Sequence, residues 1–199
     1  YGNYEDFKRI NVYGTGHVIN FAKEYGIRLN HISTISVSGD FFPQKEKGLK
    51  FSENDLFIGQ NFDDNVYIKS KFEAENLVLK EMENGLYATI YRVGNLTGRY
   101  KDGLFQINVN ENKFYNVLRF ILEVGIIPED MFERDLEFTP VDLCSKVVFE
   151  LARSGGTTGR VYHITNHNHV KLDSFLSVVK LYRKDIRIVS NFNDYIGTI

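Results

Sequence analysis

Short apolar segments rich in β-branched residues alternate with amphipathic helical segments along this chain. Residues 27–37 (IRLNHISTISV) and 86–93 (LYATIYRV) each have the composition of a buried strand. Between them, apolar residues recur at helical spacing from Phe72 to Met82, and the pattern stops at Gly85. Strands that alternate with helices in this way favour a parallel sheet covered by helices on both faces.

The remaining segments extend this α/β pattern. The spacing predicts helices over residues 5–25, 67–85, 114–127, 140–155 and 171–183, and strands over 136–139, 160–165 and 185–190. Residues 40–64 have no sustained period and are expected to form a long loop, a type of segment that is often functional. Ligands of parallel sheets bind beyond the carboxyl ends of the strands, so functional residues are expected near 34–38 and 93–95.

Composition and charge exclude several function classes. The formal net charge of −2 provides no basic footprint for a nucleic acid or an anionic membrane. Cys144 is the only cysteine, which excludes an internal disulfide and suits a reducing cytosol. No apolar run approaches the roughly 20 residues that a membrane span needs. We therefore expect a cytoplasmic protein with neither a nucleic-acid nor a membrane partner.

Two tyrosine–lysine pairs share the spacing Tyr-x-x-x-Lys: Tyr67 with Lys71, and Tyr4 with Lys8. On a helix this spacing places both side chains on one face, where the ammonium would lower a phenol pKa that is otherwise near 10. About one such pair is expected by chance in a chain of this composition. Only the Tyr67 pair lies between the strand ending STISVSG and the strand ending RVGN, so this pair is the candidate general acid.

Taken in order, these motifs resemble those of the extended short-chain dehydrogenase/reductase superfamily. The motifs are INVYGT at 10–15, STISVSG at 33–39, YIKSK at 67–71, YRVGNLTG at 91–98 and FTPVD at 138–142. Within this branch, they most resemble the thioester reductase domains that terminate nonribosomal peptide synthetases. Five ordered motifs over some 140 positions carry the resemblance, since each motif alone has a high false-positive risk.

The resemblance implies roles for particular residues. Tyr67 would be the catalytic acid, and Lys71 would lower its pKa and bind the cofactor ribose. Val93, Gly94 and Asn95 would line the nicotinamide. No metal site is expected, because His163, His167 and His169 have no cysteine or carboxylate at ligand spacing and are interpreted as part of a polar loop.

A hydroxyl on the active-site strand would stabilise the developing oxyanion together with Tyr67. In the family it lies five positions before the glycine, which implies Thr34, with Ser33 and Ser36 as less favoured candidates. Strand alternation would place Thr34 and Ser36 on the same face, so geometry alone does not choose between them.

Other residues have two open interpretations. Arg92 either supports the site or pairs with a surface carboxylate, and Asn11 either supports the site or is a helix-start residue. The aromatic stripe of the predicted helix 114–127 is interpreted as core in preference to a substrate tunnel. Its members are Phe114, Tyr115, Leu118, Phe120 and Ile121.

The glycine-rich loop that cradles a dinucleotide pyrophosphate is not present in this sequence. GTGHVI at 14–19 lacks the third glycine and is predicted to lie inside a helix. We therefore expect the carboxyl-terminal part of a reductase domain, inactive by itself, whose complete form uses NADPH.

The expected fold class is α/β: an incomplete NAD(P)-binding Rossmann-type parallel sheet with a small, mostly helical substrate-binding subdomain. Residues 1–104 would form the core and 105–199 the subdomain, with 137–166 returning to the core. The expected partner is a phosphopantetheinylated peptidyl carrier protein that presents a peptidyl thioester, released as an aldehyde or alcohol. The alternatives are a nucleotide-sugar epimerase or dehydratase, an acyl-CoA reductase, and a non-enzymatic dinucleotide sensor. Intact Thr34, Tyr67 and Lys71 argue against the sensor.

Overall fold

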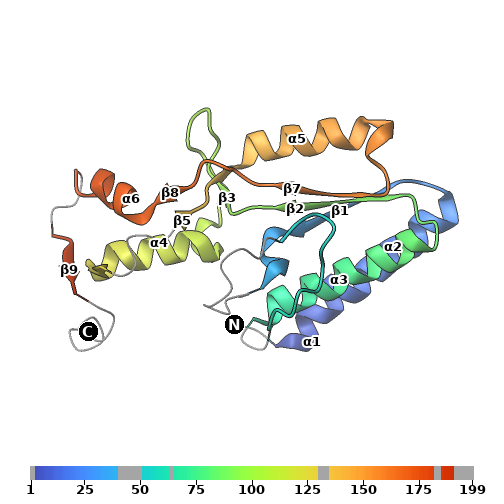
Figure 1. Ribbon diagram of the computed structural model, residues 1–199, viewed down its shortest axis with the longest axis horizontal. Coiled ribbons are helices and arrows are strands. Elements are labelled where there is room, and N and C mark those ends of the chain that lie inside the picture. Colours follow the sequence, from blue (N-terminus) through green and yellow to red (C-terminus); the bar gives the residue numbers. More distant parts are fainter. Residues whose placement is uncertain (1–2, 40–50, 63–64, 130–134, 182–184, 191–199) are drawn as a thin grey trace. The chain divides into compact units, whose positions relative to one another are not determined.

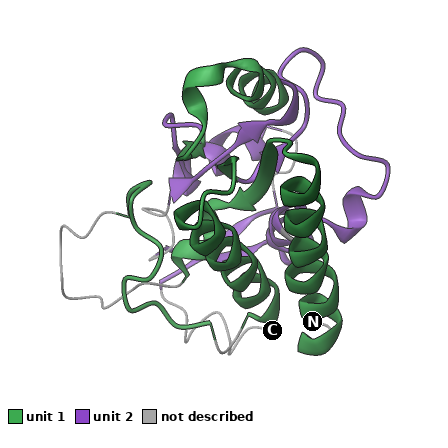
Figure 2. Cartoon of the chain, turned by 90° about the vertical axis from the view of Figure 1, so that its right-hand side faces the viewer, with its two compact units in different colours: residues 1–94, 143–165 green, residues 95–142, 166–199 purple. Residues whose placement is uncertain are grey.

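The computed structural model describes residues 3–39, 51–62, 65–129, 135–181 and 185–190 (Figure 1). Of the predicted loop over 40–64, only 51–62 lie within this described part. The chain divides into two compact units, residues 1–94 with 143–165 and residues 95–142 with 166–199 (Figure 2). The division into a cofactor core and a substrate subdomain, with its boundaries at 104 and 137–166, stays a prediction.

The first unit is built on a three-stranded parallel sheet. Its strands are β1 (Leu29–Thr34), β2 (Ala88–Val93) and β7 (Arg160–Ile164), in the order β1-β2-β7. All six residues of β2 are buried, as expected for a central strand that is covered on both faces. The register pairs Thr34 with Val93 and Arg92 with His163. The predicted parallel α/β sheet is therefore confirmed.

Helices cover both faces of this sheet. On one face lie α2 (Gly14–Tyr25) and α3 (Val66–Glu83), and Figures 1 and 2 show α5 (Val141–Arg153) on the other. Helix α2 ends where Gly26 adopts a left-handed φ of 61°. The apolar core between α2, α3 and the sheet contains Ile19, Ala22, Leu29, Val78, Leu86, Ala88 and Ile90.

The helix that leads into α2 contains a π-helical segment. Helix α1 (Tyr4–Phe7) continues into η1 (Lys8–Tyr13) and from there directly into α2. Segments with this wider turn are uncommon and occur frequently at functional sites. The segment GTGHVI, which begins at Gly14, therefore lies inside a helix as predicted. Asn11 lies within η1 in the middle of the same continuous helix, so the interpretation of Asn11 as a helix-start residue is wrong.

The second unit contains helices α4 (Lys113–Val124) and α6 (Leu172–Val179). Its described strands form three short pairs: β3 (Leu96–Thr97) with β6 (Thr139–Pro140), β4 (Ile126–Pro128) with β9 (Arg187–Val189), and β5 (Asp135–Leu136) with β8 (Val170–Lys171). Its core is formed by Ile127, Leu172, Leu176 and Ile186.

The aromatic stripe on α4 is only partly core. Leu118 is 8% exposed and Ile121 packs against the core of the second unit, in agreement with the core interpretation. Phe120 is 54% exposed and therefore is not a core residue in this structure. The hydroxyl of Tyr115 accepts a hydrogen bond from the backbone N–H of Gly98 at 2.9 Å, which ties α4 to the segment after β3.

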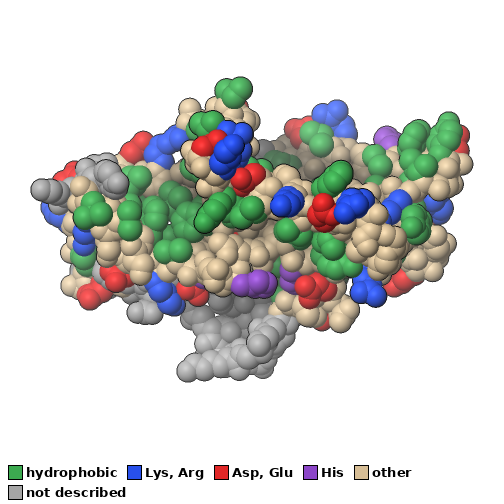
Figure 3. Space-filling model, turned by 90° about the horizontal axis from the view of Figure 1, so that it is seen from above, with side chains coloured by type: hydrophobic (Ala, Val, Ile, Leu, Met, Phe, Trp, Pro, Cys, Tyr) green, Lys and Arg blue, Asp and Glu red, His purple; other side chains and the backbone are tan. Residues whose placement is uncertain are grey.

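Acidic and basic side chains are interspersed over the face of the molecule in Figure 3, without a continuous basic stripe on that face. This distribution agrees with the small net charge of the chain. None of the helices in the described ranges is long and apolar enough to cross a membrane.

Candidate active site

Parallel pairing places the carboxyl ends of β1 and β2 at one edge of the sheet. Thr34 ends β1, Val93 ends β2, and the two residues are register partners. Gly94 follows directly, and its backbone N–H donates to the carbonyl of Ile164 at 2.9 Å. Asn95 is the first residue of the second unit, where its backbone N–H donates to a carboxylate oxygen of Glu137 at 2.6 Å.

The three candidate hydroxyls occupy different environments. Ser33 is 2% exposed and donates to the Glu75 carboxylate at 2.5 Å, so this hydroxyl is already engaged in the protein interior. Thr34 is partly exposed, and its Oγ1 accepts from the backbone N–H of Ser36 at 3.2 Å. The expected common face of Thr34 and Ser36 is wrong, because the strand ends at Thr34 and a 3₁₀ helix, η2 (Ile35–Ser38), follows.

Tyr67 lies on the first turn of α3, which Asn65 caps by accepting from the N–H of Ile68 at 3.1 Å. Tyr67 is 43% exposed and packs edge-to-face against Phe7, with ring centroids 6.0 Å apart. Its phenol has no hydrogen-bond partner within the described part of the chain. Partial burial raises the pKa of Tyr67, so the expected lowering of this pKa by Lys71 is wrong for this structure.

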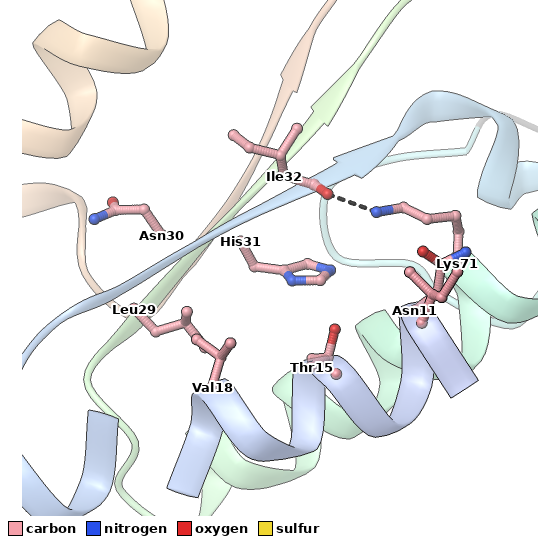
Figure 4. A pocket seen from close by; sticks show the side chains of 10 residues that line it. Asn11, Thr15, Val18, Leu29, Asn30, His31, Ile32 and Lys71 are labelled. Atoms are coloured by element: carbon pink, nitrogen blue, oxygen red, sulfur yellow. Dashed lines mark hydrogen bonds between the residues drawn. The ribbon is translucent and has the colours of Figure 1, made fainter. Parts of the chain in front are cut away.

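Lys71 lies one turn further along α3. Its ammonium donates to the backbone carbonyl of Ile32 on β1 at 2.7 Å. Burial lowers the pKa of Lys71, and the negative charge of Glu75 opposes that shift. The lysine lines a pocket of about 400 Å³ between β1 and the η1–α2 helix (Figure 4). Ten residues line this pocket: Ile10, Asn11, Gly14, Thr15, Val18, Leu29, Asn30, His31, Ile32 and Lys71.

His31 is a pocket residue that the sequence reasoning missed. It is 9% exposed, and Figure 4 shows its ring extending from β1 into the space beside Lys71 and Thr15. Its Nε2 is buried and has no hydrogen-bond partner among the described residues. Burial, and then the charge of Lys71, lower the pKa of His31 to about 4, so the ring is neutral at pH 7. The available signal was a histidine at an inward-facing position of a buried strand.

Asn11 supports the turn that carries Tyr67. Its Nδ2 donates to the Ser70 hydroxyl at 2.8 Å, and that hydroxyl donates to the backbone carbonyl of Tyr67 at 2.8 Å. The side chain of Asn11 therefore joins η1 to the first turn of α3 through a partly buried contact. This arrangement agrees with the interpretation of Asn11 as a support for the site.

Arg92 is fully buried and forms an ion pair with Glu75, with 2.7 Å between the guanidinium and carboxylate atoms. Both side chains are 0% exposed, so the alternative of a surface ion pair is wrong. His163 is the register partner of Arg92, and its Nε2 accepts a hydrogen bond from the guanidinium at 3.0 Å. His163 lies within β7, which confirms the strand predicted over 160–165 and shows that the polar-loop interpretation is wrong for this histidine.

The pocket beside Lys71 lies along the first four residues of β1 and contains polar groups from β1 and α3. Lys71 donates one hydrogen bond to Ile32 and, as an ammonium, carries three donors in total. The neighbouring Nε2 of His31 is a buried polar atom that still lacks a partner within the described residues. A pocket that combines free donors with a partnerless nitrogen suits a hydroxyl-rich ligand, because hydroxyl groups both accept and donate.

The chain is similar to several known proteins. The sequence model of the NAD_binding_4 family, described as male sterility protein, matches residues 1–148. A component of linear gramicidin synthase from Brevibacillus parabrevis is 25% identical over 178 residues, which cover 89% of this chain and 3% of that protein. The predicted resemblance to reductase domains of nonribosomal peptide synthetases is confirmed by two solved structures.

One of these structures is the reductase domain of the aureusimine biosynthetic cluster, with 35% identity and a TM-score of 0.83. The match covers 100% of this chain and 52% of that one. The other is a thiolation-reductase di-domain from an archaeal nonribosomal peptide synthetase, with 30% identity and a TM-score of 0.81, covering 96% and 51%. The chain thus spans about half the length of the solved proteins that it matches.

Proposed function

This chain belongs to the NAD_binding_4 family of male sterility proteins, and from that premise we propose that it is part of a reductase that releases carrier-bound acyl or peptidyl thioesters. The observation that carries the proposal is that Thr34 pairs with Val93 while Lys71 of α3 donates to the Ile32 carbonyl on the same strand as Thr34. The amino-terminal turns of α3 hold Tyr67 and Lys71. The similarity to reductase domains at 30% and 35% identity supports the same substrate class.

The proposed site residues act as a proton donor and an oxyanion clamp. When bound, NADPH would supply a hydride to the thioester carbon, and Lys71, Val93, Gly94 and Asn95 would hold its nicotinamide end. Tyr67 and Thr34 donate hydrogen bonds to the carbonyl oxygen as its negative charge develops. The raised pKa of Tyr67 keeps its phenol protonated at neutral pH, as an acid requires before it acts.

Proton transfer from Tyr67 to this oxygen forms a hemithioacetal. Collapse of the hemithioacetal breaks the carbon–sulfur bond and releases an aldehyde and the carrier thiol. Reduction of the aldehyde to an alcohol would need a second NADPH for the hydride and a second proton from Tyr67 after its phenol has been reprotonated from water.

The proposed partner is a carrier protein whose phosphopantetheine arm presents the thioester, and the proposed cofactor is NADPH rather than NADH. The similarity to a thiolation-reductase di-domain and to a gramicidin synthase supports the carrier partner. A carrier-bound thioester distinguishes this reaction from an acyl-CoA reductase and from sugar-nucleotide chemistry, neither of which involves a carrier domain.

The test is NADPH oxidation by the complete reductase domain that contains this chain, with an acyl thioester on the carrier protein or on pantetheine. We expect one NADPH oxidised per thiol released if the product is the aldehyde and two if it is the alcohol, and faster turnover with NADPH than with NADH. Turnover of acyl-CoA but not of the carrier-bound thioester would contradict the proposal, as would oxidation of NADPH without thiol release.

A further inference from the structure

Arg92 makes an unusually complete set of contacts inside the first unit. Its Nε and one terminal nitrogen bind the Glu75 carboxylate at 2.8 and 2.7 Å. Its terminal nitrogens donate to the backbone carbonyls of Ser52 at 3.0 Å and Asp55 at 2.5 Å. Each nitrogen of this buried guanidinium therefore has an acceptor, which offsets the cost of removing the charge from water.

Glu75 extends the same network to the active-site strand. Its second carboxylate oxygen accepts from the hydroxyl of Ser33, the residue directly before Thr34 on β1. Glu75 itself lies one helical turn after Lys71 on α3, and Arg92 lies directly before Val93 on β2. The ion pair thus joins the three elements that carry the proposed site residues of the first unit.

Arg92 also anchors one end of the segment 51–60, which we call the strand-end loop. Besides its two carbonyl contacts, the guanidinium lies 4.5 Å from the ring centroid of Phe51. That ring stacks on His163, with 5.5 Å between centroids. A cation over an aromatic face that is withdrawn from water is a stabilising contact.

The other end of the strand-end loop is attached beside Thr34. Gln60 is 5% exposed, and its side-chain amide donates to the carbonyls of Val37 at 3.0 Å and Leu56 at 2.6 Å. Gly39 passes so close that a Cβ there would lie 2.8 Å from the Gln60 side chain. The loop is therefore fixed at two points, one at the end of β2 and one just beyond β1.

Between its two anchors the strand-end loop presents an exposed aromatic side chain. Phe57 is 70% exposed, and its ring packs against Phe72 of α3 in an edge-to-face arrangement with centroids 6.3 Å apart. Exposure of a large aromatic ring on a segment whose backbone is held by buried contacts is more typical of a binding surface than of a loose loop.

We propose that the Glu75–Arg92 ion pair is a positioning pair that holds the strand-end loop in place, and that this loop, through Phe57, forms a wall for the acyl part of the thioester. The inference rests on the proposed function. Stabilisation alone does not account for the pair, because apolar residues of similar volume often replace buried ion pairs without loss of stability. What apolar residues cannot reproduce is the set of hydrogen bonds to two loop carbonyls.

Arg92→Lys in the complete reductase domain is the decisive variant, because lysine keeps the buried positive charge beside Glu75 but cannot bind both loop carbonyls. The matched control is Arg153→Lys, which alters an exposed pair with Glu150. We expect amide hydrogen exchange of residues 51–60 to become at least about tenfold faster in Arg92→Lys and to be unchanged in the control. Unchanged exchange in Arg92→Lys would overturn the positioning role.

Separate KM values for the thioester and for NADPH distinguish an effect on the strand-end loop from an effect on the cofactor site. In Arg92→Lys we expect KM for the acyl thioester to rise about tenfold and KM for NADPH to stay within about twofold. Phe57→Ala, which leaves the ion pair intact, should raise the thioester KM alone and leave hydrogen exchange of the loop unchanged. Equal changes in both KM values, or no effect of Phe57→Ala, would overturn the substrate-wall role.

These outcomes are distinct from failure of the proposed function. If the wild-type domain turns over no carrier-bound thioester, the proposed function and the substrate wall are both wrong. The hydrogen-exchange comparison then still decides whether Arg92 anchors the loop. If Arg92→Lys does not fold, Glu75→Gln replaces it in the exchange measurement. Glutamine removes the charge that orients the Arg92 guanidinium, so exchange of 51–60 should become at least about tenfold faster, and unchanged exchange would overturn the positioning role.

Discussion

The two Tyr-x-x-x-Lys pairs share one spacing and have different surroundings. The Tyr4 hydroxyl donates to both carboxylate oxygens of Glu73, at 2.6 and 2.7 Å. Burial and this carboxylate raise the pKa of Tyr4 to about 12. The Tyr67 hydroxyl has no partner within the described residues, and its ring is 43% exposed and packs against Phe7.

The lysines of the two pairs differ in the same way. Lys8 is the first residue of η1, and its ammonium lies over the rings of Tyr4 and Tyr13, 5.7 Å from each centroid. Lys71 instead donates to a strand carbonyl and lines the pocket beside His31. The comparison teaches that the spacing sets only a common helix face. Whether the phenol is available for chemistry depends on the groups that tertiary folding places next to it.

The largest expected difference between the pairs is in turnover. Tyr67→Phe in the complete reductase domain should lower kcat for NADPH-dependent thioester reduction by about 10²- to 10⁴-fold, because the general acid is removed. The matched variant Tyr4→Phe should stay within about twofold of the wild type. Steady-state NADPH oxidation measures both. A Tyr67→Phe variant that keeps most of the wild-type rate would show that the acid lies elsewhere.

The next effect is a pH dependence of the free energy of unfolding that comes from His31, the pocket residue beside Lys71. The pKa of His31 is about 4 in the folded protein and 6.5 ordinarily. Below pH 6.5 the unfolded chain therefore binds a proton that the folded chain does not, whereas above pH 6.5 this residue does not disfavour the fold. Stability is lost as the pH falls from 6.5 towards 4, and the loss amounts to about 2–3 kcal/mol at pH 4.5.

Urea unfolding at pH 7 and pH 4.5 measures the His31 effect. His31→Gln, which removes the titrating group, should show a correspondingly smaller loss between the two pH values than the wild type. His17→Gln, on the outer face of α2, is the matched control and should show the full wild-type loss. Equal losses in the wild type and His31→Gln would mean that His31 is not buried in its neutral form.

A smaller effect is expected for cofactor binding. Lys71→Met should raise KM for NADPH by about 10- to 100-fold, the effect of losing a hydrogen bond from a charged group. It should also raise the pKa of His31, because the charge of Lys71 contributes to lowering that pKa. Lys8→Met should change neither quantity. The imidazole resonances in an NMR pH titration report the second readout without turnover.

The smallest expected effect is on stability, where the Tyr4 hydroxyl should matter more than the Tyr67 hydroxyl. Tyr4→Phe should lower the free energy of unfolding by about 1 kcal/mol, because the Tyr4 hydroxyl holds Glu73 of α3 whereas the Tyr67 hydroxyl has no partner within the described ranges. Tyr67→Phe should change it by less than about 0.5 kcal/mol. Chemical denaturation of both variants measures the difference. A larger loss for Tyr67→Phe would mean that this phenol is structural.

Much of the fold was predictable from local patterns. The apolar stripe from Phe72 to Met82 predicted α3, the β-branched run at 86–93 predicted β2, and Gly26 ends α2 as expected of a left-handed cap. Prediction was weaker where an element changes type. The run 27–37 read as one strand, but β1 stops at Thr34 and turns into a 3₁₀ helix, where the Thr34 side chain caps the turn.

The members of the candidate site stay a prediction, and the contacts that they make were foreseen only in part. The order of motifs singled out Thr34, Tyr67 and Lys71, whose catalytic roles stay predictions. The electrostatics differed from expectation, because Tyr67 is partly buried and its pKa is raised. His31 and the pairing of Arg92 with Glu75 were not foreseen, since no local pattern shows which buried polar groups will meet.

The sequence alone therefore determined the elements, their alternation and the order of the motifs, because helical and strand periodicity depend on residues only a few positions apart. The tertiary structure decided which tyrosine is left without a partner among the described residues, which hydroxyl is engaged by a carboxylate, and which charges are buried. Glu73 lies 69 positions from Tyr4, and Glu75 lies 42 from Ser33 and 17 from Arg92. Contacts over such separations form only when the sheet and its helices pack together, and burial then makes each unmatched polar group costly.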